Sequence, residues 1–151
     1  MIRSLLSNDY LVAALRLLLG LLFVFASIDK ISDPSAFANA ITNYKLISGS
    51  LSLFIATVLP WIELLSGLAI LLGFWFHGAA MVLFILVSSF TLAVLTGLIR
   101  GLDISCGCFT LDPHVSKIGW LKVFENFGLI LVSLVLFYSD AKRFQLQQNS
   151  D

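Results

Sequence analysis

The sequence predicts an all-α integral membrane protein, a four-helix bundle with a short interfacial helix between the first and second spans. Hydrophobic residues make up 59% of the 151 residues and charged residues only 12%. The charged fraction is about half that of a typical soluble domain. The mean hydropathy is +0.99. The apolar residues also gather in stretches of about 20, the length that a helix needs to cross a bilayer.

Four such stretches follow one another, and we expect each of them to span the membrane. They lie at residues 10–28, 51–73, 78–99 and 118–138. The second and third share an uncharged run of 36 residues, positions 64 to 99, which is too long for one crossing. The segment "GFWFHG" divides this run, because glycines and interfacial aromatic residues are typical of a turn. Four spans place both termini on one side, and we expect residues 1–151 to form a single domain.

The loop after the first span contains the pattern of a short helix. Asp33, or the serine before it, can cap the helix, and Pro34 suits its first position. Phe37, Ile41 and Tyr44 then fall at i, i+4 and i+7 on one face. This pattern predicts a helix that lies in the membrane interface.

Charged residues inside the predicted spans must face the bundle interior, because a lone charge at mid-membrane costs about 2.5–3.5 kcal/mol on insertion scales. Arg16 and Glu63 lie roughly 9 and 15 Å from the terminal side at 1.5 Å per residue, so we expect them to pair. Glu125 in the fourth span is placed either to bond Lys122 or to reach towards the loop that carries the cysteines. The Arg16–Glu63 pair either locks two helices together or takes part in ligand or proton handling. We take Arg16, Glu63 and Tyr44 as candidate cofactor-binding residues, with a quinone as a possible cofactor that no motif identifies.

The segment "GLDISCGCFTLDP", residues 101–113, holds both cysteines of the chain, Cys106 and Cys108. Gly107 allows the backbone to bend so that the two thiols can join, and so tight a ring predicts a strained, easily reduced disulfide. Packing, lipidation and a metal site that includes His114 are the alternatives. A structural zinc site normally needs four ligands, so we favour thiol redox chemistry and take the two cysteines as candidate catalytic residues.

Three segments together resemble the methylamine-utilisation MauE family, within the wider DoxX-like group of small four-helix membrane proteins. They are "RLLLGLLFVFASIDKISDPSAFANAITNYKL" from Arg16, "LPWIELLSGLAILLG" around Glu63, and "CGCF" from Cys106. The family usually has a glycine after the last motif, where this chain has Thr110.

The resemblance implies a part in the maturation of a periplasmic enzyme, alongside an extracytoplasmic thioredoxin-like partner. For the methylamine-dehydrogenase type of client, the target is a small subunit rich in disulfides. The protein would pass electrons or disulfides through Cys106 and Cys108, as a thiol–disulfide oxidoreductase or its membrane subunit. The resemblance also implies a multi-pass protein of the bacterial inner membrane, with the cysteines outside and both termini in the cytoplasm.

Two other functions remain open at this point. One is an assembly or transport factor without redox turnover. The other is a subunit of a quinone-linked sulfur oxidoreductase complex, which the DoxX-like group suggests. The lipid bilayer is a partner in every case. A formal net charge of zero and the lack of any basic run give no indication of a nucleic-acid partner.

Overall fold

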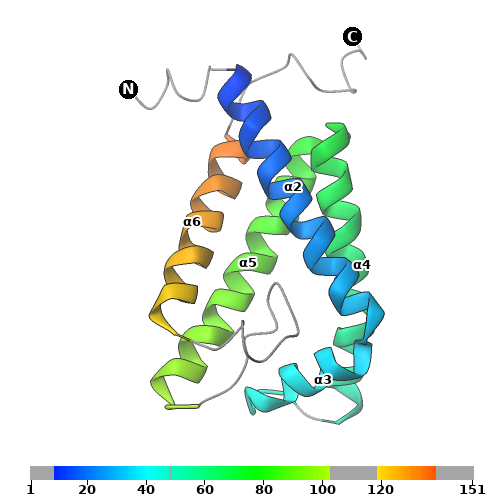
Figure 1. Cartoon of the computed structure of the whole chain (residues 1–151), viewed down its shortest axis with the longest axis vertical. Helices are drawn as coiled ribbons and strands as arrows, with labels where there is room; N and C mark the ends of the chain where they lie inside the picture. The colour runs from blue at the N-terminus through cyan, green and yellow to red at the C-terminus, as the bar shows by residue number, and fades with distance from the viewer. Residues whose placement is uncertain (1–8, 48, 103–118, 139–151) are drawn as a thin grey trace.

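The computed structural model describes residues 9–47, 49–102 and 119–138, and every regular element in these ranges is a helix (Figure 1). In chain order the helices are α2 (Asp9–Ser32), α3 (Pro34–Asn43), α4 (Ser50–Leu72), α5 (Phe76–Ile99) and α6 (Trp120–Phe137). The all-α fold predicted from the sequence is therefore confirmed.

Helices α2, α4, α5 and α6 are each long and apolar enough to cross a membrane, which confirms the four predicted spans. Their bounds differ from the prediction by a few residues. The largest difference is at α2, which continues through Lys30 to Ser32 instead of ending at Ile28. The predicted turn lies between α4 and α5, where Gly73 ends α4 in the left-handed conformation, with a φ of 70°.

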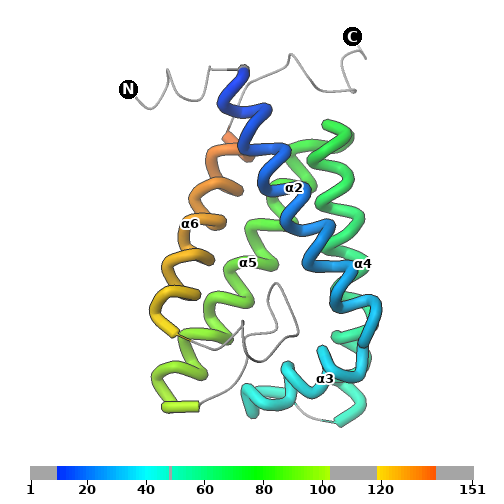
Figure 2. The backbone as a smooth tube through the Cα atoms, in the orientation of Figure 1, coloured from blue at the N-terminus to red at the C-terminus, as the bar shows by residue number. Residues whose placement is uncertain are grey.

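The four long helices stand side by side, and α3 lies across one end of the bundle (Figures 1 and 2). The start of α2 and the end of α6 lie at the opposite end. Helix α2 packs most extensively against α4, and α5 against α6. The main core cluster draws on all four long helices, for example through Phe23, Ile70, Leu83 and Leu129.

Two glycines allow α2 and α4 to approach closely. A Cβ atom on Gly67 of α4 would lie 3.1 Å from the carbonyl oxygen of Gly20 in α2. A Cβ atom on Gly20 would lie 2.5 Å from Cγ of Leu71. Small residues at such a crossing let helix backbones pack directly on one another, as is common between helices in membranes.

Helix α3 begins as the sequence predicts. Asp33 is its N-cap, and one carboxylate oxygen accepts a hydrogen bond of 2.9 Å from the backbone N–H of Ala36. Pro34 occupies the first position, where its missing N–H leaves no helical bond unmade. Phe37 and Tyr44 are buried, so the predicted apolar face of α3 points into the bundle.

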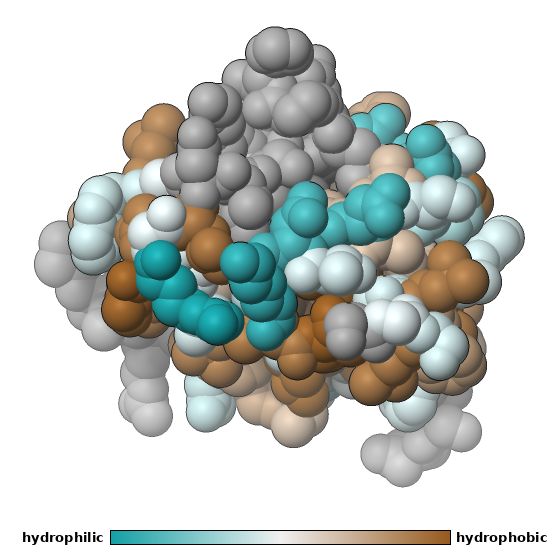
Figure 3. Space-filling model, turned by 90° about the horizontal axis from the view of Figure 1, so that it is seen from below, coloured by the Kyte–Doolittle hydropathy of each residue, from teal (hydrophilic) through white to brown (hydrophobic). Residues whose placement is uncertain are grey.

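The outer surface of the bundle is apolar along its length and polar at the end where α3 lies. Large exposed apolar side chains such as Phe25, Phe54 and Leu65 face outward from the spans, as a lipid environment requires. Figure 3 views the α3 end, where hydrophilic side chains gather on the face. Exposed polar residues there include Lys45 and Arg100. This distribution is that of a multi-pass membrane protein whose α3 end meets water.

Candidate functional site

A buried ion pair joins α2 to α4. The Nζ atom of Lys30 lies 2.9 Å from Oε1 and 2.7 Å from Oε2 of Glu63. The Lys30 and Glu63 side chains are only 1% and 0% exposed. Both carboxylate oxygens thus accept hydrogen bonds from one ammonium group. A buried ion pair is tolerated when its hydrogen-bonding groups are satisfied in this way, since an unpaired charge away from water is strongly destabilising.

Two aromatic rings cover the ammonium group of Lys30. Its Nζ atom lies 5.2 Å from the ring centroid of Phe37 in α3 and 4.9 Å from that of Phe90 in α5. Both distances are within the range of cation–π attraction. The ion pair therefore connects four elements, because Lys30 comes from α2, Glu63 from α4, Phe37 from α3 and Phe90 from α5.

The predicted pairing of Arg16 with Glu63 is wrong. The Arg16 guanidinium donates from Nε to the carbonyl of Ile70 and from Nη2 to that of Leu71, each at 3.2 Å. These carbonyls belong to the last turn of α4, where backbone acceptors lack the i+4 partners of the helix interior; the Ile70 carbonyl also accepts a bond of 3.2 Å from the N–H of Gly73. Ile70 is seven residues beyond Glu63, roughly 10 Å along the helix axis. Arg16 also lies over the ring of Phe76, at 5.2 Å from the centroid.

The sequence reasoning overlooked Lys30, although a signal for it exists. Ending the first span at Ile28 placed Lys30 in the following loop. Buried residues of α2 recur at Leu19, Phe23 and Ala26, with spacings of four and three. The next residue in that pattern is Lys30, so helical periodicity alone puts it on the inner face.

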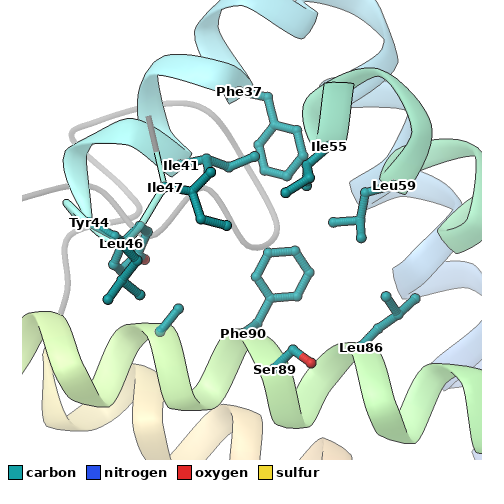
Figure 4. Close-up of a pocket in the computed structure, with 11 residues that line it drawn as sticks. Phe37, Ile41, Tyr44, Leu46, Ile47, Ile55, Leu59, Leu86, Ser89 and Phe90 are labelled. Atoms are coloured by element: carbon teal, nitrogen blue, oxygen red, sulfur yellow. The ribbon is translucent and has the colours of Figure 1, made fainter. Parts of the chain in front are cut away.

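A cavity of about 190 Å³ lies beneath α3, between α4 and α5 (Figure 4). Its lining is almost wholly apolar and consists of Phe37, Ile41, Tyr44, Leu46, Ile47, Ile55, Leu59, Leu86, Ser89, Phe90 and Ala93. Figure 4 shows the rings of Phe37 and Phe90 projecting into the space from α3 and α5. The same two rings contact Lys30, so the ion pair and the cavity share a wall.

Tyr44 is the member of the predicted cofactor-binding set that lines this cavity. The residue is 6% exposed, and burial raises the pKa of its hydroxyl above the ordinary value. The phenol is therefore protonated at neutral pH. The backbone carbonyl of Tyr44 accepts a hydrogen bond of 3.4 Å from Nη1 of Arg100. This contact ties the end of α3 to the end of α5.

The structure separates the predicted cofactor-binding residues. Glu63 does not line the cavity and is paired with Lys30. Arg16 is near the opposite end of the bundle, at the last turn of α4. Cys106 and Cys108, the predicted catalytic pair, lie outside the described residues.

In α6, Glu125 pairs with Lys122, one of the two placements that the sequence allows, but its side chain is exposed and does not face the bundle interior. Nζ of Lys122 lies 2.7 Å from Oε2 of Glu125, and the two side chains are 20% and 44% exposed. The next residue, Asn126, is 1% exposed. Its Nδ2 atom has no hydrogen-bond partner among the described residues.

Comparisons with known proteins agree on one family. A family model described as "Methylamine utilisation protein MauE" matches residues 8–139. The chain is 33% identical over 129 residues to the methylamine utilization protein MauE of Methylophilus methylotrophus, over 84% of this chain and 68% of that protein. It is 32% identical over 137 residues to the MauE protein of Methylorubrum extorquens, over 90% of this chain and 73% of that protein. No solved structure matches the chain significantly.

Proposed function

Because the chain belongs to the MauE family of methylamine-utilisation proteins, we propose that it is the membrane component of a thiol–disulfide system. In this role it exchanges disulfides with an extracytoplasmic thioredoxin-like protein and so supports the maturation of a periplasmic client of the methylamine-dehydrogenase type. Cys106 and Cys108 are the reacting groups, and the protein resides in the bacterial inner membrane.

The exchange follows ordinary thiol chemistry. A thiolate of the partner attacks one sulfur of the Cys106–Cys108 disulfide, and a mixed disulfide forms while the other cysteine leaves as a thiolate. The second thiol of the partner then attacks the mixed disulfide. The partner becomes oxidised and the dithiol of this protein is regenerated, so two electrons and two protons pass to Cys106 and Cys108.

The observation that carries this proposal is the Cys-Gly-Cys sequence in the connection between α5 and α6. The end of α5 and the start of α6, on either side of this connection, lie at the end of the bundle where α3 lies (Figure 1). Cys106 follows Leu102 by four residues, so chain length alone keeps the two Cα atoms within about 14 Å. Chain length thus limits how far the thiols can lie from the polar end of the molecule, which supports access by a soluble partner.

Contacts among the described residues hold α3 firmly at the end of the bundle where α5 ends. Arg100, next to the cysteine segment, binds the carbonyl of Tyr44, and Phe37 of α3 rests against the Lys30–Glu63 pair. Helix α3 is thereby fastened to the bundle from both of its ends. A site on a rigid element is held more precisely than a site on an unsupported loop.

A redox titration of the two thiols in isolated membranes tests the proposal. The sequence has two cysteines, so a mass shift on alkylation reports on Cys106 and Cys108 alone. We expect one two-electron transition between a dithiol and a disulfide, and a trapped mixed disulfide with the thioredoxin-like partner in either Cys106→Ser or Cys108→Ser. Thiols that stay reduced at every potential, with no trapped adduct, would instead indicate a docking factor without redox turnover.

A further inference from the structure

We propose that the cavity between α3, α4 and α5 holds part of one acyl chain of an anionic phospholipid, whose headgroup binds Lys45 and Arg100. Only described residues form this site, and it does not depend on the chemistry of Cys106 and Cys108. Such a site differs from general contact with the bilayer, because one lipid keeps one place on the protein.

The walls of the cavity suit a hydrocarbon chain. Nine of the eleven lining residues have side chains without polar atoms, and the Ser89 hydroxyl already donates to the carbonyl of Ile85 at 2.8 Å. An acyl chain needs no hydrogen-bond donor from the wall. A chain that enters from the bilayer fills a space whose walls otherwise lack contacts on one side, and it gains dispersion attraction there.

The cavity is elongated in the direction of the spans. Its α5 wall runs from Leu86 to Ala93, roughly 10 Å along the helix axis. Figure 4 shows Tyr44 and Leu46 at one end of the space and Leu59 and Leu86 at the other. An engineered apolar cavity of about 150 Å³ in another protein holds benzene, and this one measures about 190 Å³. It therefore accommodates a stretch of one chain, and the rest of the lipid stays outside.

The mouth of the cavity lies within the thickness of the bilayer. Leu46 and Ser89 line the cavity and are exposed, so the space opens to the surface between α5 and the segment that follows α3. Ser89 precedes Arg100 by eleven residues, roughly 16 Å along α5, and the hydrocarbon core is about 30 Å thick. A lipid whose headgroup lies at the polar end can thus place a chain in this opening.

Two cationic residues lie beside the mouth. Nη1 of Arg100 donates to the carbonyl of Tyr44 at 3.4 Å, and this carbonyl belongs to the peptide bond between Tyr44 and Lys45. Lys45 in turn directly precedes Leu46. Both cations are exposed, and no carboxylate among the described residues forms an ion pair with either of them.

An anionic phospholipid supplies the negative charge that these two cations attract. The guanidinium of Arg100 has five N–H donors in one plane, which suits the oxygens of a phosphate. Basic pockets between membrane helices are known to bind anionic headgroups. A zwitterionic lipid carries a cation next to its phosphate, which Lys45 and Arg100 would repel.

The backbone of Lys45 supports a role for its side chain. Its φ is 54°, in the left-handed region, and it directly follows Tyr44, the C-cap of α3. Glycine or asparagine usually occupies this position, because a Cβ atom is strained there. The backbone N–H of Lys45 bonds the carbonyl of Thr42 at 2.9 Å, which glycine could do equally well. The ammonium group, and not the fold, therefore accounts for a lysine here.

Native mass spectrometry of the purified full-length protein tests the site, after release from nanodiscs with equal amounts of phosphatidylglycerol and phosphatidylcholine of the same acyl chains. We expect one retained phosphatidylglycerol per chain. Ala93→Phe fills the cavity and should remove this lipid, and Ser89→Phe should do the same from an exposed position, even where Ala93→Phe disturbs folding. Leu92→Phe is the matched control and should retain the lipid, since Leu92 is 63% exposed on the same helix and outside the lining.

The headgroup contact has its own variants. Lys45→Gln should lower retention of phosphatidylglycerol about fivefold, the effect of one basic residue near an anionic surface, and Lys45→Arg should preserve it. Lys45→Gly removes the same charge and relieves the left-handed strain. A matching loss in Lys45→Gly therefore comes from the charge and not from damage to the fold.

Three results would overturn the lipid site. One is equal retention of the two lipids by the native protein, and another is equal retention of phosphatidylglycerol by Ala93→Phe, Ser89→Phe and Leu92→Phe. The third is displacement of the lipid by free glycerol phosphate, which would indicate a phosphate site that needs no acyl chain. Loss confined to the cavity and Lys45 variants would support the site whatever the thiol titration shows.

Discussion

The Lys30–Glu63 pair stands out at the residue scale because both charges are removed from solvent. Each depends on the other for its hydrogen bonds, with both oxygens of Glu63 bound to one nitrogen. The Phe37 and Phe90 rings complete the surroundings of Lys30. Loss of one partner would leave an uncompensated charge in the bundle, which is far more costly than loss of the pair as a whole.

We therefore expect Glu63→Gln to lower the free energy of unfolding by about 3–5 kcal/mol. Combining Lys30→Met with Glu63→Leu should recover much of that loss, because no charge is then left buried. Glu125→Gln is the control, since it breaks the exposed Lys122 pair and should cost about 0.2–1 kcal/mol. Denaturant unfolding in detergent micelles measures all three, and similar losses from Glu63→Gln and Glu125→Gln would contradict the assignment.

Sequence reasoning identified Arg16 and Glu63 as residues that face inward, but it did not identify their partners, and it missed Lys30. Arg16 and Glu63 are both buried, as the cost of a charge in lipid predicts. Their partners could not be found by matching opposite charges at similar depth. Arg16 uses backbone carbonyls at the end of α4, and backbone acceptors at a helix end do not show in a count of charges. The burial of Lys30 was missed because α2 extends beyond the end of the apolar run.

At the scale of the elements, local signals were predictive and contacts between helices were not. The start of α3 follows from Asp33 and Pro34, whose effects act within one turn. The close crossing of α2 and α4 depends instead on which faces meet, and Gly20 and Gly67 gave no sign of it in the sequence. The cavity has the same origin, since it forms only where α3, α4 and α5 come together.

We expect Gly67→Leu to reduce the free energy of unfolding by about 1–3 kcal/mol, the usual cost of overpacking. The reason is steric, because a Cβ atom there meets the backbone oxygen of Gly20 at 3.1 Å. Gly128→Leu on α6 is the matched control, since a Cβ atom at Gly128 meets nothing within 4 Å. Its effect should stay within about 0.5 kcal/mol. Thermal unfolding in micelles compares the two, and equal effects would exclude the crossing as a constraint.

For the whole molecule, four spans determine that both termini share a side but not which side it is. The burial of Lys30 in α2 removes one positive charge from the loop side. The positive charges outside the four spans are then Arg3, Lys142 and Arg143 on the terminal side and Lys45, Arg100 and Lys117 on the loop side. Equal counts give no orientation by the positive-inside rule, so the orientation rests on the proposed chemistry.

Disulfide exchange persists in oxidising compartments, so we predict that the Cys106–Cys108 loop lies on the extracytoplasmic side. An impermeant thiol reagent applied to intact cells after mild reduction should label both cysteines. The control is Ser4→Cys in a Cys106→Ser/Cys108→Ser background, which should be labelled only after lysis. The reverse pattern would place the α3 end in the cytoplasm and refute the predicted orientation.

Maturation of the client in cells tests the thiol–disulfide role most directly. Chains carrying Cys106→Ser, Cys108→Ser or the neighbouring control Ser105→Ala would replace the native protein, and alkylation would report the disulfides of the periplasmic client. We predict that either cysteine substitution leaves the client reduced and inactive, while Ser105→Ala supports full maturation. Full oxidation of the client with both serine variants, at normal protein levels, would contradict the account.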